Sequence, residues 1–63
     1  MPVVRIEMWA GRSREQKRKL IKEVTEAITS SLGIPKDQVT VILNEIPKDN
    51  WGLAGELASK TKK

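Results

Sequence analysis

The chain has 63 residues, of which 38% are hydrophobic, and its 12 lysines and arginines outnumber 8 acidic residues to give a net charge of +4. A chain of this length forms one domain, residues 1–63, and buries only roughly 60% of its unfolded surface, so a lone monomer would be marginally stable. It has no cysteine and no histidine, which excludes disulfides and removes the usual zinc ligands. Oligomerisation is the remaining means of stabilisation.

The same composition limits the partners of the chain. No apolar run approaches the ~20 residues of a membrane span, and no signal peptide is present, so we expect a cytoplasmic protein without a membrane partner. The positive charge suits nucleic acid or small anions, but only Trp9 and Trp51 could stack on bases. Many cations also fall at i,i+4 spacing from an acid, which predicts a solvated face and no nucleic-acid partner; these pairs are Glu15–Lys19, Lys19–Glu23 and Lys22–Glu26.

The first expected element is a strand from Val3 to Met8 or Trp9, because strand-forming residues alternate there with polar ones. Pro2 precedes this strand, and its place directly after Met1 suits removal of the methionine. Two interpretations stay open for Pro2. It either begins an edge strand, where a missing N–H costs nothing, or presents a rigidly mounted secondary amine as a base.

A helix is expected from Arg14 to Leu32, because apolar residues recur there at helical spacing. Ser13 and Gln16 form a capping-box pattern at its start, and Gly33 suits the left-handed position after its end. The next strand is expected over 39–46, and its apolar residues on both faces favour a parallel sheet. Residues 47–50 should form a turn, 51–55 a small hairpin, and 56–63 a polar end.

Strand, helix and strand form one βαβ unit, whose crossover should be right-handed. One helix covers only one face of the sheet. We therefore expect an α+β subunit with a short C-terminal hairpin that dimerises into a four-stranded sheet with two helices, with further copies covering the bare face.

Arg12 is the second informative residue. It lies before the N-cap of the helix, where the dipole disfavours cations by ~0.3–1 kcal/mol, and Arg14 repeats this placement. Cations beside free helix N–H groups attract a carboxylate, so Arg12 is either an anion-binding residue or a tolerated surface charge.

Four segments together resemble the 4-oxalocrotonate tautomerase family: Pro2, the run Gly11-Arg12-Ser13-Arg14-Glu15-Gln16-Lys17, the helix segment 20–28, and the segment 55–60. The resemblance covers nearly the whole chain, so residues 1–63 would be a single tautomerase domain with a tautomerase/MIF-like fold. It implies a homohexamer built as a trimer of dimers, with hetero-oligomers as an alternative. It also implies cofactor-free keto–enol chemistry on small 2-hydroxydienoate or 2-oxo acids.

In that chemistry Pro2, after removal of Met1, moves the proton, and the arginine matching Arg12 binds a substrate carboxylate. Burial and a nearby cation would lower the pKa of the Pro2 ammonium from its ordinary ~7.7–8, bringing it close to neutral pH. Water-activating relatives add a carboxylate, but Asp49 and Glu56 are the nearest acids to segment 51–54, so simple tautomerisation is preferred.

Three positions depart from the family pattern. Thr40 stands where the family has a second arginine that polarises the 2-oxo group, and loss of such a donor typically costs ~10²–10³ in rate. Trp51 replaces a pocket aromatic, and Trp9 replaces a pocket aliphatic; either could instead pack in an interface. The substrate-binding candidates are thus Arg12, Trp51, Trp9 and Thr40, with Pro2 as the catalytic residue and no metal ligand.

Three hypotheses remain. The first is an isomerase, a homo-oligomeric tautomerase acting through Pro2. The second is a subunit of a hetero-oligomeric tautomerase whose paralogue supplies the arginine missing at Thr40. The third is a non-catalytic basic interaction module.

Overall fold

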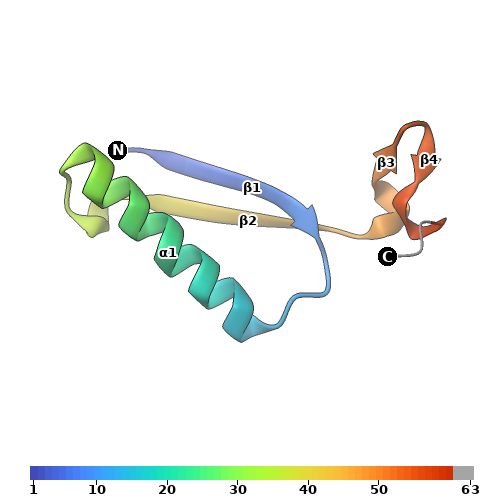
Figure 1. Ribbon diagram of the computed structural model, residues 1–63, viewed down its shortest axis with the longest axis horizontal. Coiled ribbons are helices and arrows are strands. Elements are labelled where there is room, and N and C mark those ends of the chain that lie inside the picture. Colours follow the sequence, from blue (N-terminus) through green and yellow to red (C-terminus); the bar gives the residue numbers. More distant parts are fainter. Residues whose placement is uncertain (61–63) are drawn as a thin grey trace.

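The computed structural model describes residues 1–60. The main elements are a strand, a helix and a second strand, followed by a hairpin of two short strands: β1 (Val3–Trp9), α1 (Arg14–Leu32), β2 (Thr40–Ile46), β3 (Gly52–Leu53) and β4 (Glu56–Leu57). Short 3₁₀ helices occupy the connections at Lys36–Gln38, Lys48–Asn50 and Ala58–Lys60. The helix runs alongside the two long strands, and the hairpin projects beyond their end (Figure 1). This is the βαβ subunit with a C-terminal hairpin that the sequence predicts.

β1 and β2 pair in parallel, with Val3 opposite Thr40 and Trp9 opposite Ile46. A parallel pair needs a long crossover connection, and α1 provides it. The second strand begins one residue later than expected. The N–H of Val39 donates to the carbonyl oxygen of Lys36 at 3.1 Å, which closes a 3₁₀ turn and removes Val39 from the ladder.

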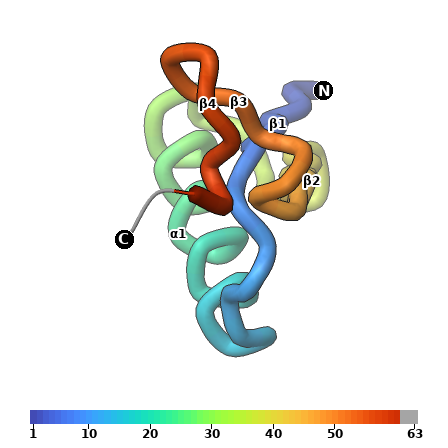
Figure 2. Tube along the Cα trace, turned by 90° about the vertical axis from the view of Figure 1, so that its right-hand side faces the viewer, coloured from blue at the N-terminus to red at the C-terminus, as the bar shows by residue number. Residues whose placement is uncertain are grey.

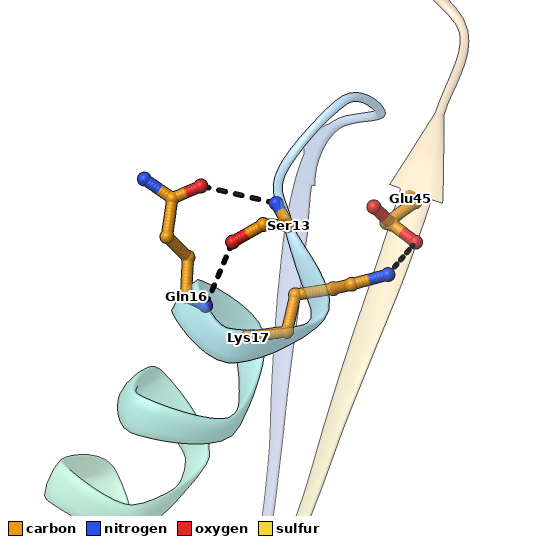
Figure 3. A network of polar contacts seen from close by, with 4 residues as sticks. All are labelled: Ser13, Gln16, Lys17 and Glu45. Carbon is orange, nitrogen blue, oxygen red and sulfur yellow. Dashed lines mark hydrogen bonds and ion pairs between the residues drawn. The ribbon is translucent and has the colours of Figure 1, made fainter.

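α1 has the predicted bounds because both of its ends are capped. The Ser13 hydroxyl accepts a bond of 3.1 Å from the Gln16 backbone N–H, and the Gln16 side-chain oxygen accepts one of 3.0 Å from the Ser13 N–H (Figure 3). Gly33 ends the helix at φ 66°, and its N–H donates to the Thr29 carbonyl oxygen at 2.9 Å. The capping-box prediction is confirmed.

Two of the three expected ion pairs form along α1, Lys19–Glu23 at 4.0 Å and Lys22–Glu26 at 3.4 Å. The third prediction is wrong, because Glu15 pairs with Arg18 at 3.3 Å and not with Lys19. Residues at i+3 and i+4 both neighbour residue i on a helix surface. Here the Glu15 carboxylate contacts the guanidinium group of Arg18 at i+3 and not the ammonium group of Lys19 at i+4. These side chains are mostly solvent-exposed, so this surface is a solvated charged face.

The hairpin begins one residue later and ends two residues later than expected, over residues 52–57. Leu53 pairs with Glu56 and Gly52 with Leu57, so the turn consists of Ala54 and Gly55. Both turn residues have positive φ, 55° and 81°, as a two-residue hairpin turn requires. The expected polar end over 56–63 is therefore wrong at its start, which is strand and 3₁₀ helix; residues 61–63 lie outside the described residues.

The sheet is covered on one face only. The alternating exposure of both strands leaves Val4, Ile6 and Leu43 half-buried toward α1, while Val3 and Ile42 on the opposite side are exposed. Figure 2 shows α1 on one side of the strands, and no second helix lies on the other side within residues 1–60. The fold thus leaves a sheet face of mixed character without a cover, where Val3 and Ile42 lie among the polar side chains Arg5, Glu7, Thr40 and Asn44.

The chain does not form a core of its own. Within the described residues only Ala58 is buried, and its N–H donates to the Trp51 carbonyl oxygen at 2.8 Å. The radius of gyration is 14.6 Å, whereas a compact chain of this length would have about 10.6 Å. Within residues 1–60, no helix has both the length and the hydropathy needed to cross a membrane.

Candidate active site

Pro2 and Thr40 lie together at the start of the sheet. The Thr40 backbone N–H donates to the Pro2 carbonyl oxygen at 3.1 Å, which extends the ladder by one bond beyond β1. Pro2 is half-buried and Thr40 is exposed. Met1 precedes Pro2 and is 86% exposed, so its removal would not disturb the packing.

Trp9 and Trp51 lie together at the opposite end of the sheet. Their rings contact edge to face, with centroids 5.9 Å apart and an angle of 80° between the planes. Such pairs stabilise by about 0.5–1.5 kcal/mol beyond the area that they bury. The Trp9 indole Nε1 is buried, and it has no hydrogen-bond partner within residues 1–60. These residues form one aromatic wall.

A cavity of about 370 Å³ adjoins this wall, lined by Trp9, Ala10, Gly11, Arg12 and Lys48. Lys48 extends its ammonium over the Trp9 ring, with Nζ 4.6 Å from the centroid. Gly11 has φ 121°, a conformation that favours glycine, and it turns the chain from β1 into the helix cap. Arg12 follows at once, so the turn and the cap together fix where its backbone lies.

An ion pair ties the start of α1 to the end of β2. Lys17 Nζ lies 2.9 Å from Glu45 Oε1, with both side chains about 30% exposed, as Figure 3 shows. Lys17 and Arg12 also line a second cavity of about 210 Å³. The pair therefore holds the helix end that carries Arg12 against the sheet.

The five predicted site residues form two separate groups within one chain. Pro2 and Thr40 lie at one end of the sheet, and Trp9, Arg12 and Trp51 lie at the other. Six residue steps along β1 span about 20 Å. A small substrate cannot touch both groups of a single chain.

Sequence reasoning missed Lys48. Its segment was expected to be a turn, and a lysine in a turn is ordinarily solvated. The available signal was its spacing, because a 3₁₀ turn over Lys48–Asn50 places the lysine beside the tryptophan that follows it. The Trp51 N–H donates to the Lys48 carbonyl oxygen at 3.2 Å, and this bond closes that turn.

The chemistry available here is anion binding by cations beside aromatic rings, with no histidine or cysteine in the chain. Within the described residues, no three acidic side chains gather so as to hold a metal ion. The βαβ fold with its C-terminal hairpin and the cavity lined by Arg12 and Lys48 together define the class of protein, a small α+β protein with a cationic cavity at one end of its sheet.

The family follows from comparison with known proteins. The family model described as a tautomerase enzyme matches residues 2–61, and the chain belongs to the tautomerase family. A 2-hydroxymuconate tautomerase from Pseudomonas putida is 49% identical over 63 residues, all of both chains. The chain is accordingly an isomerase, and the hypothesis of a non-catalytic module is set aside.

Solved structures agree in fold. The crystal structure of YwhB, a homologue of 4-oxalocrotonate tautomerase, has a TM-score of 0.90 at 36% identity, over 97% of this chain and all of the other. A heterohexamer 4-oxalocrotonate tautomerase from Chloroflexus aurantiacus has a TM-score of 0.91 at 31% identity, over 98% of this chain and all of the other. The predicted fold and family are confirmed, while the roles of the site residues stay predictions.

Proposed function

We propose that this chain catalyses keto–enol tautomerisation of small 2-hydroxydienoate and 2-oxo acids, with Pro2 as the base once Met1 is removed. The observation that carries the proposal is the fixed position of Pro2. The Pro2 carbonyl oxygen accepts a hydrogen bond from the Thr40 N–H, which holds the N-terminal end of the chain at the sheet. The P. putida relative named 2-hydroxymuconate tautomerase supports the substrate class.

The proton balance needs no other reagent. The free amine of Pro2 accepts the proton from the enol oxygen as the C=O bond forms and the double bonds shift along the dienol. The resulting ammonium then returns a proton to carbon, which completes the isomerisation. An amine whose pKa lies near neutral pH suits both steps, because it must accept and release a proton at the same pH.

The two groups of site residues are brought together by a second copy. Antiparallel pairing of the free β1 edges of two chains sets the start of one strand beside the end of the other. Pro2 then meets Trp9 and Arg12 of the partner subunit, and the two-stranded sheets join into one of four strands with two helices. The substrate carboxylate binds Arg12, while its reacting carbon faces Pro2.

Further copies cover the remaining apolar surface. The exposed side chains Val3 and Ile42 lie on the bare sheet face, and Leu53 and Leu57 lie on the projecting hairpin. A trimer of dimers covers three bare faces at once, so we propose a homohexamer. Thr40 favours the second candidate, a hetero-oligomer in which a paralogue supplies an arginine, as a heterohexamer exists in C. aurantiacus.

The test uses the purified chain with Met1 removed. We expect it to ketonise 2-hydroxymuconate and phenylenolpyruvate, a reaction that is monitored by ultraviolet absorbance. We also expect it to sediment as a hexamer. The Pro2→Ala variant keeps a primary α-amine but loses the secondary amine and the pyrrolidine ring that holds it, and its kcat should fall at least about tenfold. Equal kcat for the two proteins would overturn the role of Pro2. A stable folded monomer at micromolar concentration would overturn the shared site.

A further inference from the structure

We propose that Lys48 is a second substrate-binding cation, which together with Arg12 holds one carboxylate group of the substrate. This inference rests on the proposed function, because it assigns a residue to the acid-binding end of the same site. It names a residue that the sequence analysis left in a turn.

The cavity geometry brings the two cations to one space. Arg12 and Lys48 both line the cavity of about 370 Å³, although 36 positions separate them in the chain. Arg12 reaches the cavity from the cap of α1, and Lys48 reaches it from the 3₁₀ turn after β2. Trp9 lines the same cavity. A guanidinium group and an ammonium group that line one cavity suit the two oxygens of a carboxylate.

The charges in this cavity are not neutralised by the described chain. The four ion pairs within residues 1–60 use Lys17, Arg18, Lys19 and Lys22, and none uses Arg12 or Lys48. No acidic side chain lines the cavity. An entering carboxylate therefore meets two cations without first displacing an internal acid.

Trp9 holds the Lys48 ammonium in place. A cation over an indole face is attracted by about 0.5–1 kcal/mol at exposed sites and more when it is desolvated, so the flexible lysine stem gains a preferred position. Trp51 packs edge-on against the same ring and fixes it. The buried Trp9 Nε1 is a further donor that the described chain leaves without a partner. The cavity thus combines two cations with a rigid aromatic wall.

Lys48 and Thr40 belong to opposite ends of the sheet. Lys48 lies beside Trp9, and Thr40, where the family resemblance implies a second arginine, lies beside Pro2. In the proposed dimer the end with Lys48 faces Pro2 of the partner subunit. Lys48 contributes binding of the acid, and it does not replace polarisation of the 2-oxo group.

The experiment measures binding without turnover. Trp9 and Trp51 are the only aromatic residues of the chain, so its intrinsic fluorescence reports on this wall alone. The assembled protein with Met1 removed is titrated with monomethyl glutarate, which has one carboxylate, and with dimethyl glutarate, which has none, at constant ionic strength. The variants are Lys48→Met, Lys48→Arg and, as a control on the solvated charged face of α1, Lys22→Met.

We expect Lys48→Met to raise the Kd of monomethyl glutarate about tenfold or more, because one charge-assisted contact is lost. Lys48→Arg and Lys22→Met should bind monomethyl glutarate within about twofold of the wild type, and dimethyl glutarate should bind all four proteins equally weakly. Lys48→Met binding as tightly as the wild type would overturn the proposal. Lys48→Arg binding as weakly as Lys48→Met would also overturn it, since packing and not charge would then be responsible.

Failure of the wild type to bind monomethyl glutarate would count against the proposal in the same way. Turnover of phenylenolpyruvate on the same preparations separates this inference from the proposed function. Charge-dependent binding without turnover would overturn the role of Pro2 and leave the two-cation subsite standing.

Discussion

The backbone N–H of Thr40 donates a 3.1 Å hydrogen bond to the carbonyl oxygen of Pro2. The position where the family resemblance implies a second arginine is therefore adjacent to the N-terminal proline in the same chain. Thr40 is exposed, so a longer side chain meets no buried neighbour. We expect Thr40→Arg to raise kcat for 2-hydroxymuconate about tenfold or more, because a preorganised donor at a developing oxyanion contributes ~10²–10³ in rate.

Steady-state kinetics on 2-hydroxymuconate would check this expectation, with Thr40→Gln as a long but neutral control. Unchanged kcat in a folded Thr40→Arg variant would show that the pocket is built around a different polarising group. A gain in Thr40→Gln as large as in Thr40→Arg would assign the effect to side-chain length and not to charge.

Arg12 should contribute mainly to substrate binding. It lines the cavity of about 370 Å³ together with Lys48, and it takes part in no ion pair within residues 1–60. Arg12→Ala removes a charged contact worth ~1.5–3 kcal/mol, so kcat/KM should fall about 10- to 150-fold, chiefly through KM. Arg14→Ala, an exposed neighbour on the same helix end, is the matched control. Equal losses of kcat/KM in both variants would show that Arg12 acts only as a general surface charge.

The capping box at Ser13 should stabilise the start of α1. Ser13→Ala removes the hydroxyl that accepts the Gln16 N–H at 3.1 Å, and such a loss costs about 1 kcal/mol. Urea unfolding at fixed protein concentration would measure the change in the free energy of unfolding. Ser30→Ala, at an exposed position inside the same helix, should be neutral or slightly stabilising because alanine favours helix. A Ser13→Ala variant as stable as the wild type would contradict the importance of the cap.

Ala54 occupies a backbone conformation that alanine disfavours. Its φ is 55°, and it precedes Gly55 in the two-residue turn between β3 and β4. Asn-Gly is the preferred pair in such turns, so Ala54→Asn should stabilise the protein by about 0.5–1 kcal/mol. Thermal unfolding would show a raised Tm. Gly55→Ala should lower it, and a lower Tm for Ala54→Asn would mean that the turn has another geometry in the assembled protein.

The sequence predicts the βαβ body closely because its signals are local. The Ser13 cap and Gly33 bound α1 at the residues where they occur, and the alternation in β1 sets its faces. The hairpin begins one residue later and ends two residues later than the sequence predicts, since its register depends on the pairing of Gly52 with Leu57. No local pattern marks that pairing, because the segment contains two glycines and few strand formers.

The site was predicted less completely, for a geometrical reason. Family resemblance supplied Pro2, Arg12 and Thr40 as candidates, but no local sequence pattern places Thr40 beside Pro2 or Trp51 beside Trp9. Lys48 enters the site through a contact with Trp9, which is 39 positions away. Such contacts depend on how β1 and β2 are aligned, and that alignment is known only from the fold.

The last prediction concerns Met1, on which the activity should depend entirely. With Met1 attached, the Pro2 nitrogen belongs to a tertiary amide, whose lone pair is delocalised and which carries no proton. It can then neither accept nor deliver a proton, and we expect kcat to fall by about 10²–10⁴-fold, the usual contribution of a positioned acid–base group. Because Met1 is 86% exposed, its presence should leave the fold and the assembly unchanged.

The measurement is the intact mass of each preparation set against its kcat, with one batch divided so that half is treated with a methionine aminopeptidase. Circular dichroism and sedimentation on both halves serve as controls for folding and assembly. If the Met1-bearing half turns over 2-hydroxymuconate as fast as the processed half, Pro2 is not the base, and the proton must move through another group.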